Sequence, residues 1–168
     1  MEYSVIRFET ANDVATITLN RPALKNALNV QMRAEITHAV KAAERNARVL
    51  VIGGAGDAFC SGQDLGDSGN ATNLDLERTL RDEYVPMLKA ISDCKIPTIC
   101  AVHGAAAGAG ANLALAADVV IAAEEAYFIQ AFTRIGLIPD AGGTYFLPRQ
   151  MGSARAMGAA LFGDKVTG

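Results

Sequence analysis

The stretch A-V-H-G-A-A-A-G-A-G-A-N-L-A-L-A-A-D at 101–118 decides the fold, because it passes from a strand into a helix through a corner of Gly and Ala. The first backbone N–H groups of a helix have no acceptor within the helix, and they carry partial positive charge. Small residues leave these groups open to a ligand, so the corner suits a developing anion. Asn112 stands where a catalytic carboxylate could follow the corner.

Composition narrows the class of protein. The 168 residues are 51% hydrophobic and 20% charged, so we expect residues 1–168 to form one globular core domain. The net charge of −3 provides no basic field, and we therefore expect no nucleic-acid partner. The two histidines stand far apart in sequence, so we expect no metal site.

Cysteine usage and polarity predict the location of the chain. Its three cysteines show no disulfide pattern, which is typical of a reducing compartment. The N-terminus lacks the features of a secretory leader, and three polar residues interrupt the apolar stretch 96–123. We expect a cytoplasmic protein that does not enter a membrane.

Hydrophobic periodicity predicts alternating strands and helices. The predicted strands are 3–9, 13–19, 49–53, 98–102 and 119–122, with a hairpin turn at Asn12-Asp13. The predicted helices are 30–46 with Asn29 as its cap, 74–92, the one leaving the corner up to Ala117, and 153–162. A loop is expected at 54–73 and a turn unit near 127–137. The order β-β-α-β-α-β-α-β predicts an α/β fold with right-handed crossovers.

Four ordered motifs carry a family resemblance. They are N-R-P-A-L-K-N-A-L (20–28), G-A-G-D-A-F-C-S-G-Q-D-L (54–65), the corner (101–118) and G-L-I-P-D-A-G-G-T (136–144). This set resembles the crotonase superfamily, the enoyl-CoA hydratase/isomerase family, and within it is most similar to the ring-epoxide isomerases of phenylacetate breakdown. The resemblance implies a spiral of ββα units, a trimer or dimer of trimers, and a C-terminal helical region that is truncated in this chain.

The resemblance also implies an oxyanion hole for an acyl-CoA thioester, with one backbone amide at Gln63 and the other at Ala109. A proton beside a thioester carbonyl is too weakly acidic for a side-chain base unless the enolate is stabilised. Each preorganised donor is worth about 3–4 kcal/mol in such sites. Because the backbone supplies the donors, we expect the chemical identity of the side chain at either position to matter less than its shape.

Coenzyme A is expected on the two loops that carry the first two motifs. By resemblance its adenine is bordered by Leu24, Lys25, Ala27, Ser61, Asp64 and Leu65. Arg21 and Lys25 are candidates for its phosphates, with solvated surface charges as the alternative. Asp64 has an alternative role, which is to bond the amides of its own loop.

The catalytic pattern departs from that of a family hydratase, which uses two glutamates. The corresponding positions are Asn112 and Phe132, which can contact substrate but cannot transfer protons at pH 7. The remaining carboxylate is Asp140, whose pKa the apolar neighbours Phe132, Ile138 and Ala141 should raise. A single base suits a proton shift between two carbons. The alternative for Asp140 is a helix N-cap after Pro139.

We therefore expect an acyl-CoA isomerase, acting on a double bond or a ring epoxide, with no prosthetic group. One alternative is an enoyl-CoA hydratase with other acid and base groups. Another, from a different class, is a CoA-binding or assembly protein without turnover. Cys60 and His103 are not expected to act in catalysis, because neither has a partner at a suitable spacing.

Overall fold

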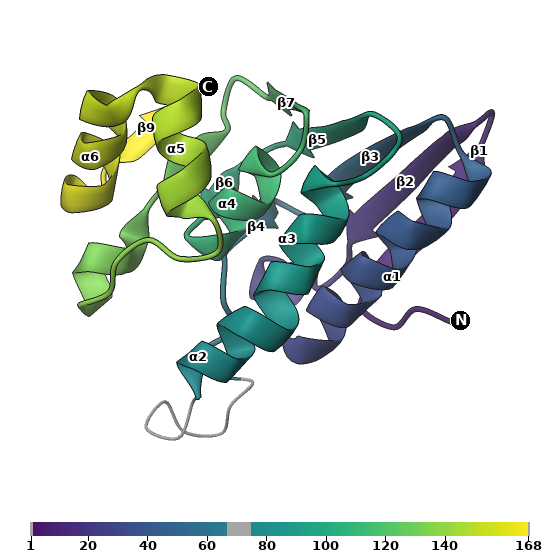
Figure 1. The fold of residues 1–168 in the computed structure, drawn as a ribbon, viewed down its shortest axis with the longest axis horizontal. Helices are drawn as coiled ribbons and strands as arrows, with labels where there is room; N and C mark the ends of the chain where they lie inside the picture. Colours follow the sequence, from purple (N-terminus) through teal and green to yellow (C-terminus); the bar gives the residue numbers. More distant parts are fainter. Residues whose placement is uncertain (1, 67–74, 168) are drawn as a thin grey trace.

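The computed structural model describes residues 2–66 and 75–167, and its strands form two sheets (Figure 1). The larger sheet has the order β1-β2-β3-β5-β7, and the smaller one β4-β6-β8-β9. The larger sheet consists of β1 (Ile6–Ala11), β2 (Val14–Leu19), β3 (Val49–Gly54), β5 (Thr98–Val102) and β7 (Val119–Ala122). The smaller sheet consists of β4 (Ala58–Cys60), β6 (Ala105–Ala107), β8 (Tyr127–Ile129) and β9 (Lys165–Thr167).

From β3 to β8 the chain gives one strand to each sheet in turn. β3, β5 and β7 are parallel in the larger sheet, and each is followed by a strand of the smaller sheet, in which β4, β6 and β8 are also parallel. A helical segment follows each pair of strands. This arrangement confirms the predicted α/β spiral of ββα units. The helical segments are η1 (Pro22–Leu24), α1 (Val30–Asn46), α2 (Leu76–Thr79), η3 (Leu80–Tyr84), α3 (Val85–Ser92), α4 (Ala109–Leu115), η4 (Ala131–Ile135), α5 (Gly143–Met151) and α6 (Ser153–Phe162).

Local sequence explains the first elements. Asn12 and Asp13 have φ values of 50° and 64°, the left-handed pair that a two-residue hairpin turn requires, and Ala11 pairs with Val14 across it. The Asn29 side chain accepts a hydrogen bond from the backbone N–H of Met32 at 2.9 Å, which caps α1 as predicted.

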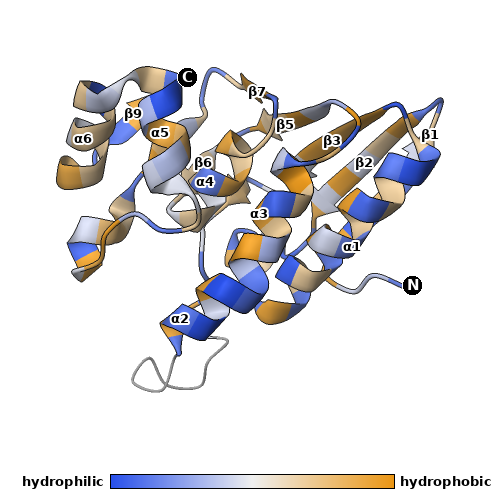
Figure 2. Cartoon of the chain, in the orientation of Figure 1, coloured by the Kyte–Doolittle hydropathy of each residue, from blue (hydrophilic) through white to orange (hydrophobic). Residues whose placement is uncertain are grey.

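The core lies between the larger sheet and the helices α1 and α3, which cover one face of it (Figure 1). The outward side of α1 is hydrophilic, whereas the strands behind it are largely hydrophobic (Figure 2). α4 differs because residues 109–114 are all buried, with neighbours on β4, β5, β6, β7 and α5. A helix enclosed in this way favours small residues where a neighbour approaches closely, as at Gly110, while Asn112 and Leu113 fill the remaining interior space.

The structure corrects several boundaries. β4 lies inside the predicted loop 54–73, whose residues 67–73 fall outside the described ranges. The corner itself contains β6, and the predicted helix 74–92 begins at Leu76 and includes the π-helical segment η3. The helix 143–151 was not predicted, and β9 pairs with β8 after the last helix. Three-residue strands are too short to show an alternating pattern. No described helix has the length and apolarity needed to cross a membrane.

Candidate active site

Two loops from distant parts of the sequence meet at the Gly-Ala corner. A Cβ atom on Gly62 would lie 2.7 Å from the carbonyl oxygen of Ala107 and 3.4 Å from the backbone nitrogen of Ala109. Gly62 also has a φ of +95°, which side chains other than that of Gly rarely adopt. The loop can approach the corner only because this residue is Gly. The backbones at Gln63 and Ala109 are consequently neighbours.

The backbone N–H groups of Gln63 and Ala109 are both left open. The N–H of Leu28 donates to the carbonyl oxygen of Gly62 at 2.7 Å, and in a trans peptide the N–H of Gln63 then points to the opposite side. The N–H of Ala109 is the first of α4 and has no acceptor in that helix. Within the described ranges neither group donates a hydrogen bond to the protein. Two open N–H groups on neighbouring backbones are what the predicted oxyanion hole requires, and that role stays a prediction.

The side chain of Gln63 has a role that the sequence did not reveal. Its Oε1 accepts hydrogen bonds from the Tyr84 hydroxyl at 2.5 Å and from Nη1 of Arg33 at 3.0 Å. The guanidinium of Arg33 also lies over the Tyr84 ring, 4.8 Å from its centre. These contacts connect the loop of Gln63 to α1 and to η3.

Arg33 is the centre of this network, although its side chain is only 2% exposed. It forms an ion pair with Glu83 at 2.6 Å and donates to the carbonyl oxygen of Leu28 at 2.6 Å. Leu28 in turn holds Gly62, so Arg33 supports the peptide that carries the N–H of Gln63. The sequence contains a signal for the burial of Arg33. This charged residue lies three residues before Ile36, on the apolar side of α1.

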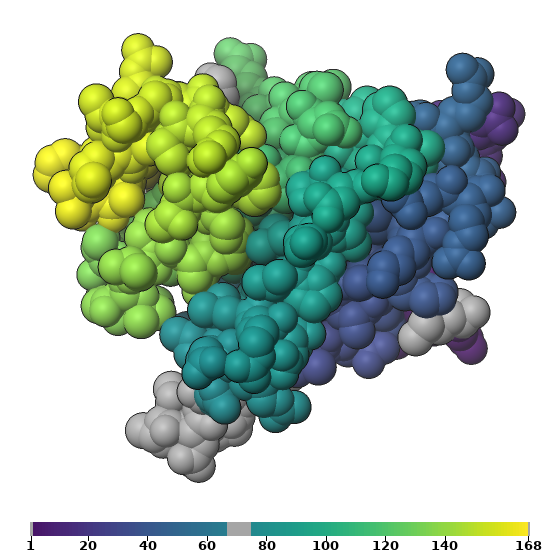
Figure 3. All heavy atoms as spheres, viewed as in Figure 1, coloured from purple at the N-terminus to yellow at the C-terminus, as the bar shows by residue number. Residues whose placement is uncertain are grey.

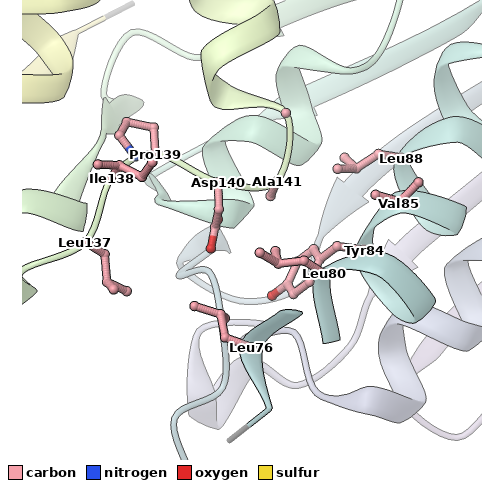
Figure 4. A pocket seen from close by; sticks show the side chains of 11 residues that line it. Leu76, Leu80, Tyr84, Val85, Leu88, Leu137, Ile138, Pro139, Asp140 and Ala141 are labelled. Carbon is pink, nitrogen blue, oxygen red and sulfur yellow. The ribbon is translucent and has the colours of Figure 1, made fainter. Parts of the chain in front are cut away.

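A cavity of about 360 Å³ lies between the helices after residue 75 and the loop before α5, where the surface is notched (Figure 3). Asp140 projects into it from one side, while Leu80 and Tyr84 face it from the other (Figure 4). The cavity is lined by Leu76, Leu80, Tyr84, Val85, Leu88, Leu137, Ile138, Pro139, Asp140, Ala141 and Gly142. Nearly all of these side chains are apolar.

Asp140 is the only carboxylate among the described residues that line the cavity. Its Oδ1 is buried and has no hydrogen-bond partner in the part of the chain that the structure describes. Burial raises the pKa of Asp140 to about 6, a shift that its own backbone amide partly offsets. The predicted direction is therefore confirmed, although Phe132 is not one of the lining residues. The N-cap alternative is wrong, because Gly142 occupies the cap position of α5.

Asn112 and Phe132 both lie in the interior. The side chain of Asn112 is fully buried, donating to the carbonyl oxygen of Asp140 at 2.8 Å and accepting from Gln130 at 2.9 Å. The Phe132 ring is buried and would lie 3.6 Å from a Cβ on Gly108. The structure thus brings both residues to the corner and its neighbouring loop. Asn112 reaches the backbone of Asp140 directly.

The residues expected around coenzyme A also come together. The N–H of Ser61 donates to the carbonyl oxygen of Lys25 at 2.9 Å, and its hydroxyl donates to that of Leu24 at 3.3 Å. Lys25 and Leu65 are exposed, whereas the side chain of Ala27 is buried. Lys25 is therefore accessible to a ligand, and its contact with a phosphate stays a prediction.

Arg21 and Asp64 stabilise this region from within. Nη1 of Arg21 bonds Oδ2 of Asp64 and the carbonyl oxygen of Ala27, both at 2.7 Å. The other carboxylate oxygen of Asp64 accepts from the N–H of Gly66 at 2.9 Å, so Asp64 does bond an amide of its own loop. Arg21 is not a solvated surface charge, because its side chain is 17% exposed and paired.

Asn26 supports the same region and was missed by sequence reasoning. Its buried amide donates to the carbonyl oxygens of Ala55, Ala58 and Phe59 at 2.8–3.1 Å and accepts from the N–H of Arg21 at 2.9 Å. It thereby joins the two loops of the first two motifs. Its φ of +55° is a conformation that Asn tolerates better than most residues. The second Asn of N-R-P-A-L-K-N was therefore a signal in the sequence for a turn at this position.

Cys60 and His103, which the sequence did not favour as catalytic residues, each contact a backbone carbonyl oxygen. Cys60 is buried and its thiol donates to the carbonyl oxygen of Asn26 at 3.1 Å, while burial raises its pKa to about 12. His103 contacts the carbonyl oxygen of Gly56 at 3.0 Å. Across residues 2–66 and 75–167, no three His, Cys, Asp or Glu residues are grouped as metal ligands would be.

Comparison with known proteins gives consistent matches. A profile of the family described as enoyl-CoA hydratase/isomerase matches residues 9–168. A Rhodobacter capsulatus protein named probable enoyl-CoA hydratase is 62% identical over 99% of this chain, which spans 64% of that protein. The 1,2-epoxyphenylacetyl-CoA isomerase of Escherichia coli is 47% identical over 92% of this chain, which spans 61% of that protein.

Solved structures agree with these matches. The crystal structure of a putative enoyl-CoA hydratase/isomerase from Mycobacterium abscessus is similar with a TM-score of 0.91 and 38% identity, covering 97% of this chain and 65% of that one. A putative enoyl-CoA hydratase from Streptomyces coelicolor A3(2) gives the same TM-score and identity. The chain thus spans slightly less than two thirds of the relatives and structures named here.

Proposed function

The chain belongs to the enoyl-CoA hydratase/isomerase family, and we propose that it isomerises acyl-CoA thioesters by moving a proton between two carbons of the acyl group. One observation carries the proposal. A single carboxylate, that of Asp140, projects into an apolar cavity with an unpaired buried oxygen and a pKa raised to about 6. Such a group is a base at neutral pH and returns a proton readily.

The reaction balances with the groups present. The carboxylate of Asp140 takes a proton from the carbon beside the thioester carbonyl, or from the γ-carbon of an unsaturated chain. The electron pair of that C–H bond moves to the thioester oxygen, and the N–H groups of Gln63 and Ala109 hydrogen-bond the resulting enolate. Asp140 then gives the proton to another carbon, and the double bond shifts. No prosthetic group is needed for these steps.

Hydration is the second candidate, supported by the name of the 62% identical relative. The residues favour it less, because Asn112 is a buried amide bonded to Gln130 and Asp140, and Phe132 carries no acidic group. Neither can hold a water molecule and exchange protons with it. A hydratase would therefore need a different acid for the second proton.

The acyl group is proposed to be apolar and uncharged. Among the described lining residues there is no Lys, Arg or His to pair with an anionic acyl group, and the Tyr84 hydroxyl is the only other polar side chain. A ring-epoxide acyl group, as in the name of the Escherichia coli relative, is a candidate on the same grounds. Coenzyme A itself is proposed to lie along Leu24, Lys25, Ser61 and Leu65, with Lys25 on its phosphates.

Self-association is part of the proposal. Met157, Leu161 and Phe162 on α6 are each at least 59% exposed, and such side chains are typical of a surface that another subunit covers. Light scattering on the purified chain measures the mass in solution. A trimer or its multiple is the expected result, and a monomer at all concentrations contradicts it.

The test of the function compares Asp140→Asn with the matched exposed variant Asp93→Asn. Turnover is followed by the ultraviolet absorbance that appears when trans-3-hexenoyl-CoA becomes a conjugated enoyl thioester, and CoA affinity by calorimetry. Loss of the base should lower turnover by about 10²–10⁴-fold with unchanged affinity, whereas Asp93→Asn should have no effect. Full turnover in Asp140→Asn rejects the proposal. Water addition to trans-2-hexenoyl-CoA without any double-bond shift in trans-3-hexenoyl-CoA favours the hydratase, and binding without either reaction favours an assembly protein.

A further inference from the structure

The loop that carries Asp140 has a backbone conformation that is energetically costly for one of its residues, Ala141. Ala141 has a φ of +46° and Gly142 a φ of +81°, so two successive residues occupy the left-handed region. For Ala this conformation costs on the order of 1 kcal/mol, and it persists only where neighbouring groups hold it. The groups that hold this loop therefore also set the direction in which Asp140 points into the cavity.

Two donors meet at the carbonyl oxygen of Asp140. The N–H of Gly143 donates to it at 2.8 Å and closes the turn, while Nδ2 of Asn112 donates at 2.8 Å from α4. The second bond is long-range in sequence, joining residues 28 positions apart. It is the one that ties the loop to the same helix that begins at Ala109.

The amide of Asn112 has only one orientation that satisfies its neighbours. Its Nδ2 must face the carbonyl oxygen of Asp140, because that oxygen cannot donate. Its Oδ1 then faces Gln130, whose Nε2 donates to it at 2.9 Å. Both side chains are at most 3% exposed, so bulk solvent does not compete for these bonds. Gln130 thus fixes the orientation of Asn112.

Gly143 completes the arrangement by leaving space. A Cβ atom at this position would lie 2.6 Å from Nδ2 of Asn112, closer than real Cβ atoms approach. Both polar ends of the Asn112 amide are hydrogen-bonded. Nδ2 could therefore move away from such a Cβ atom only by breaking its hydrogen bond to the carbonyl oxygen of Asp140. The positions of Asn112 and Gly143 are therefore coupled through one hydrogen bond.

We propose that Asn112, oriented by Gln130, is a positioning residue that holds the peptide of Asp140 and so aims its carboxylate into the cavity. The inference rests on the proposed function of Asp140 and assigns a role to the side chain that stands where a family hydratase has a glutamate. Asn112 acts through the backbone of Asp140 and does not itself touch the acyl group.

The test uses the 168-residue chain and two isosteric pairs. Asn112→Asp removes the donor toward Asp140 and keeps the shape of the side chain. Gln150→Glu is the matched control, because the amide of Gln150 donates to the carbonyl oxygen of Leu115 at 3.0 Å and also joins α5 to α4, away from the cavity. With trans-3-hexenoyl-CoA, Asn112→Asp should lower kcat about 100-fold with unchanged KM, and Gln150→Glu should leave both unchanged. Unchanged kcat in Asn112→Asp overturns the proposal.

A double-variant comparison separates positioning from general damage. Gly143→Ala should also lower kcat, but in an Asn112→Ala background it should cause no further loss, because the group it displaces is gone. Multiplying effects overturn the coupling. If Asp140→Asn retains full turnover, the proposed base fails, whatever Asn112 does. If Asp140→Asn is inactive while the Asn112 variants are fully active, only the positioning role fails.

A readout independent of turnover completes the design. Amide hydrogen exchange at Gly143 reports directly on its bond to the carbonyl oxygen of Asp140. Asn112→Ala should speed this exchange relative to Gln150→Ala. Equal exchange in the two variants overturns the proposal even if the chain has no turnover.

Discussion

Gly110 packs against Cys60 so closely that a Cβ atom on Gly110 would lie 2.4 Å from the carbonyl oxygen of Cys60 and 2.7 Å from its Sγ. The contact joins the second residue of α4 to the last residue of β4, directly before the loop of Gly62 and Gln63. The spacing between the two open N–H groups therefore depends on the absence of a side chain at Gly110.

Gly110→Ala should separate α4 from β4 and lower turnover, because the two amides would no longer face one enolate oxygen. Losing one such donor costs about 10²–10³-fold in kcat. Gly158→Ala is the control, since a Cβ atom there would meet nothing within 4 Å and the residue lies inside α6. It should raise the free energy of unfolding by about 0.5–1 kcal/mol. Steady-state kinetics and urea unfolding of both variants check this, and an active Gly110→Ala would show that the spacing is not critical.

The pH dependence of turnover should follow the ionisation of Asp140. The proposed base would act in its ionised form, and burial raises its pKa to about 6 in the folded chain. kcat/KM should therefore rise through about pH 6 and reach a plateau above it. Tyr84 is the other titratable side chain that lines the cavity, and burial raises its pKa further above its ordinary value, so it stays protonated throughout. A profile that is flat between pH 5 and 8 (roughly the range in which this group changes charge) would contradict the assignment.

Asp140 should also make the stability of the fold depend on pH. Its pKa is about 6 when folded against 3.8 for the unperturbed group, so the folded state holds the proton more tightly. The stabilisation from the protonated form is fully present below the lower value and is lost as pH rises through about 6. Asp140→Asn should thus stabilise the chain above pH 7 by roughly 1 kcal/mol, allowing for the solvent-open side of the cavity, and not at pH 4. Equal stability of the two proteins at both pH values would argue against a buried charge.

The ion pair of Arg33 and Glu83 should contribute more to the free energy of unfolding than the exposed ion pairs on α2 and η3. Arg33→Met leaves Glu83 and Oε1 of Gln63 without their cation, and it should lower the free energy of unfolding by roughly 3 kcal/mol. Arg78→Met is the comparison, because its contact with Asp82 is 4.0 Å long and exposed, and such pairs contribute about 0–1 kcal/mol.

A double variant tests the source of this cost. Replacing both Arg33 and Glu83 by Met should destabilise the chain less than Arg33→Met alone, because no unpaired charge is then left near the interior. Denaturant unfolding with tyrosine fluorescence measures the difference. Additive losses would mean that packing, and not charge, explains the role of Arg33.

The sequence predicted the elements with a clear period and the positions of the motifs. The hairpin at Asn12-Asp13, the cap at Asn29 and the strand 98–102 are all local decisions, made by turn chemistry, capping and burial. The raised pKa of Asp140 was also predictable, because its neighbours in sequence are apolar. These features depend on few residues at short range.

What the sequence could not predict depends on contacts between distant segments. The smaller sheet consists of three-residue strands, one of them Ala-Ala-Ala, which are too short to carry an alternating pattern. The side-chain bonds from Arg33 and Tyr84 to Gln63, and from Asn112 to Asp140, join residues 21–30 positions apart, and one chain without an alignment gives no pairing information. The roles proposed for Gln63, Ala109 and the coenzyme A residues stay predictions until binding or kinetics are measured.

The hydrogen bond from Tyr84 to Gln63 constrains how a chain with the proposed activity could acquire a new acyl preference. Tyr84 and Glu83 stand on the same helical segment as the lining residues Leu80 and Val85, so mutations on that wall also move the loop beside the corner. On the opposite wall Leu137 and Ile138 are exposed, and within the described ranges their side chains take no part in this hydrogen-bond network. Directed evolution toward bulkier or smaller acyl groups should therefore find productive variants on the wall of Leu137 and Ile138. Substitutions on the other wall should more often lower turnover, because they also disturb the loop of Gln63.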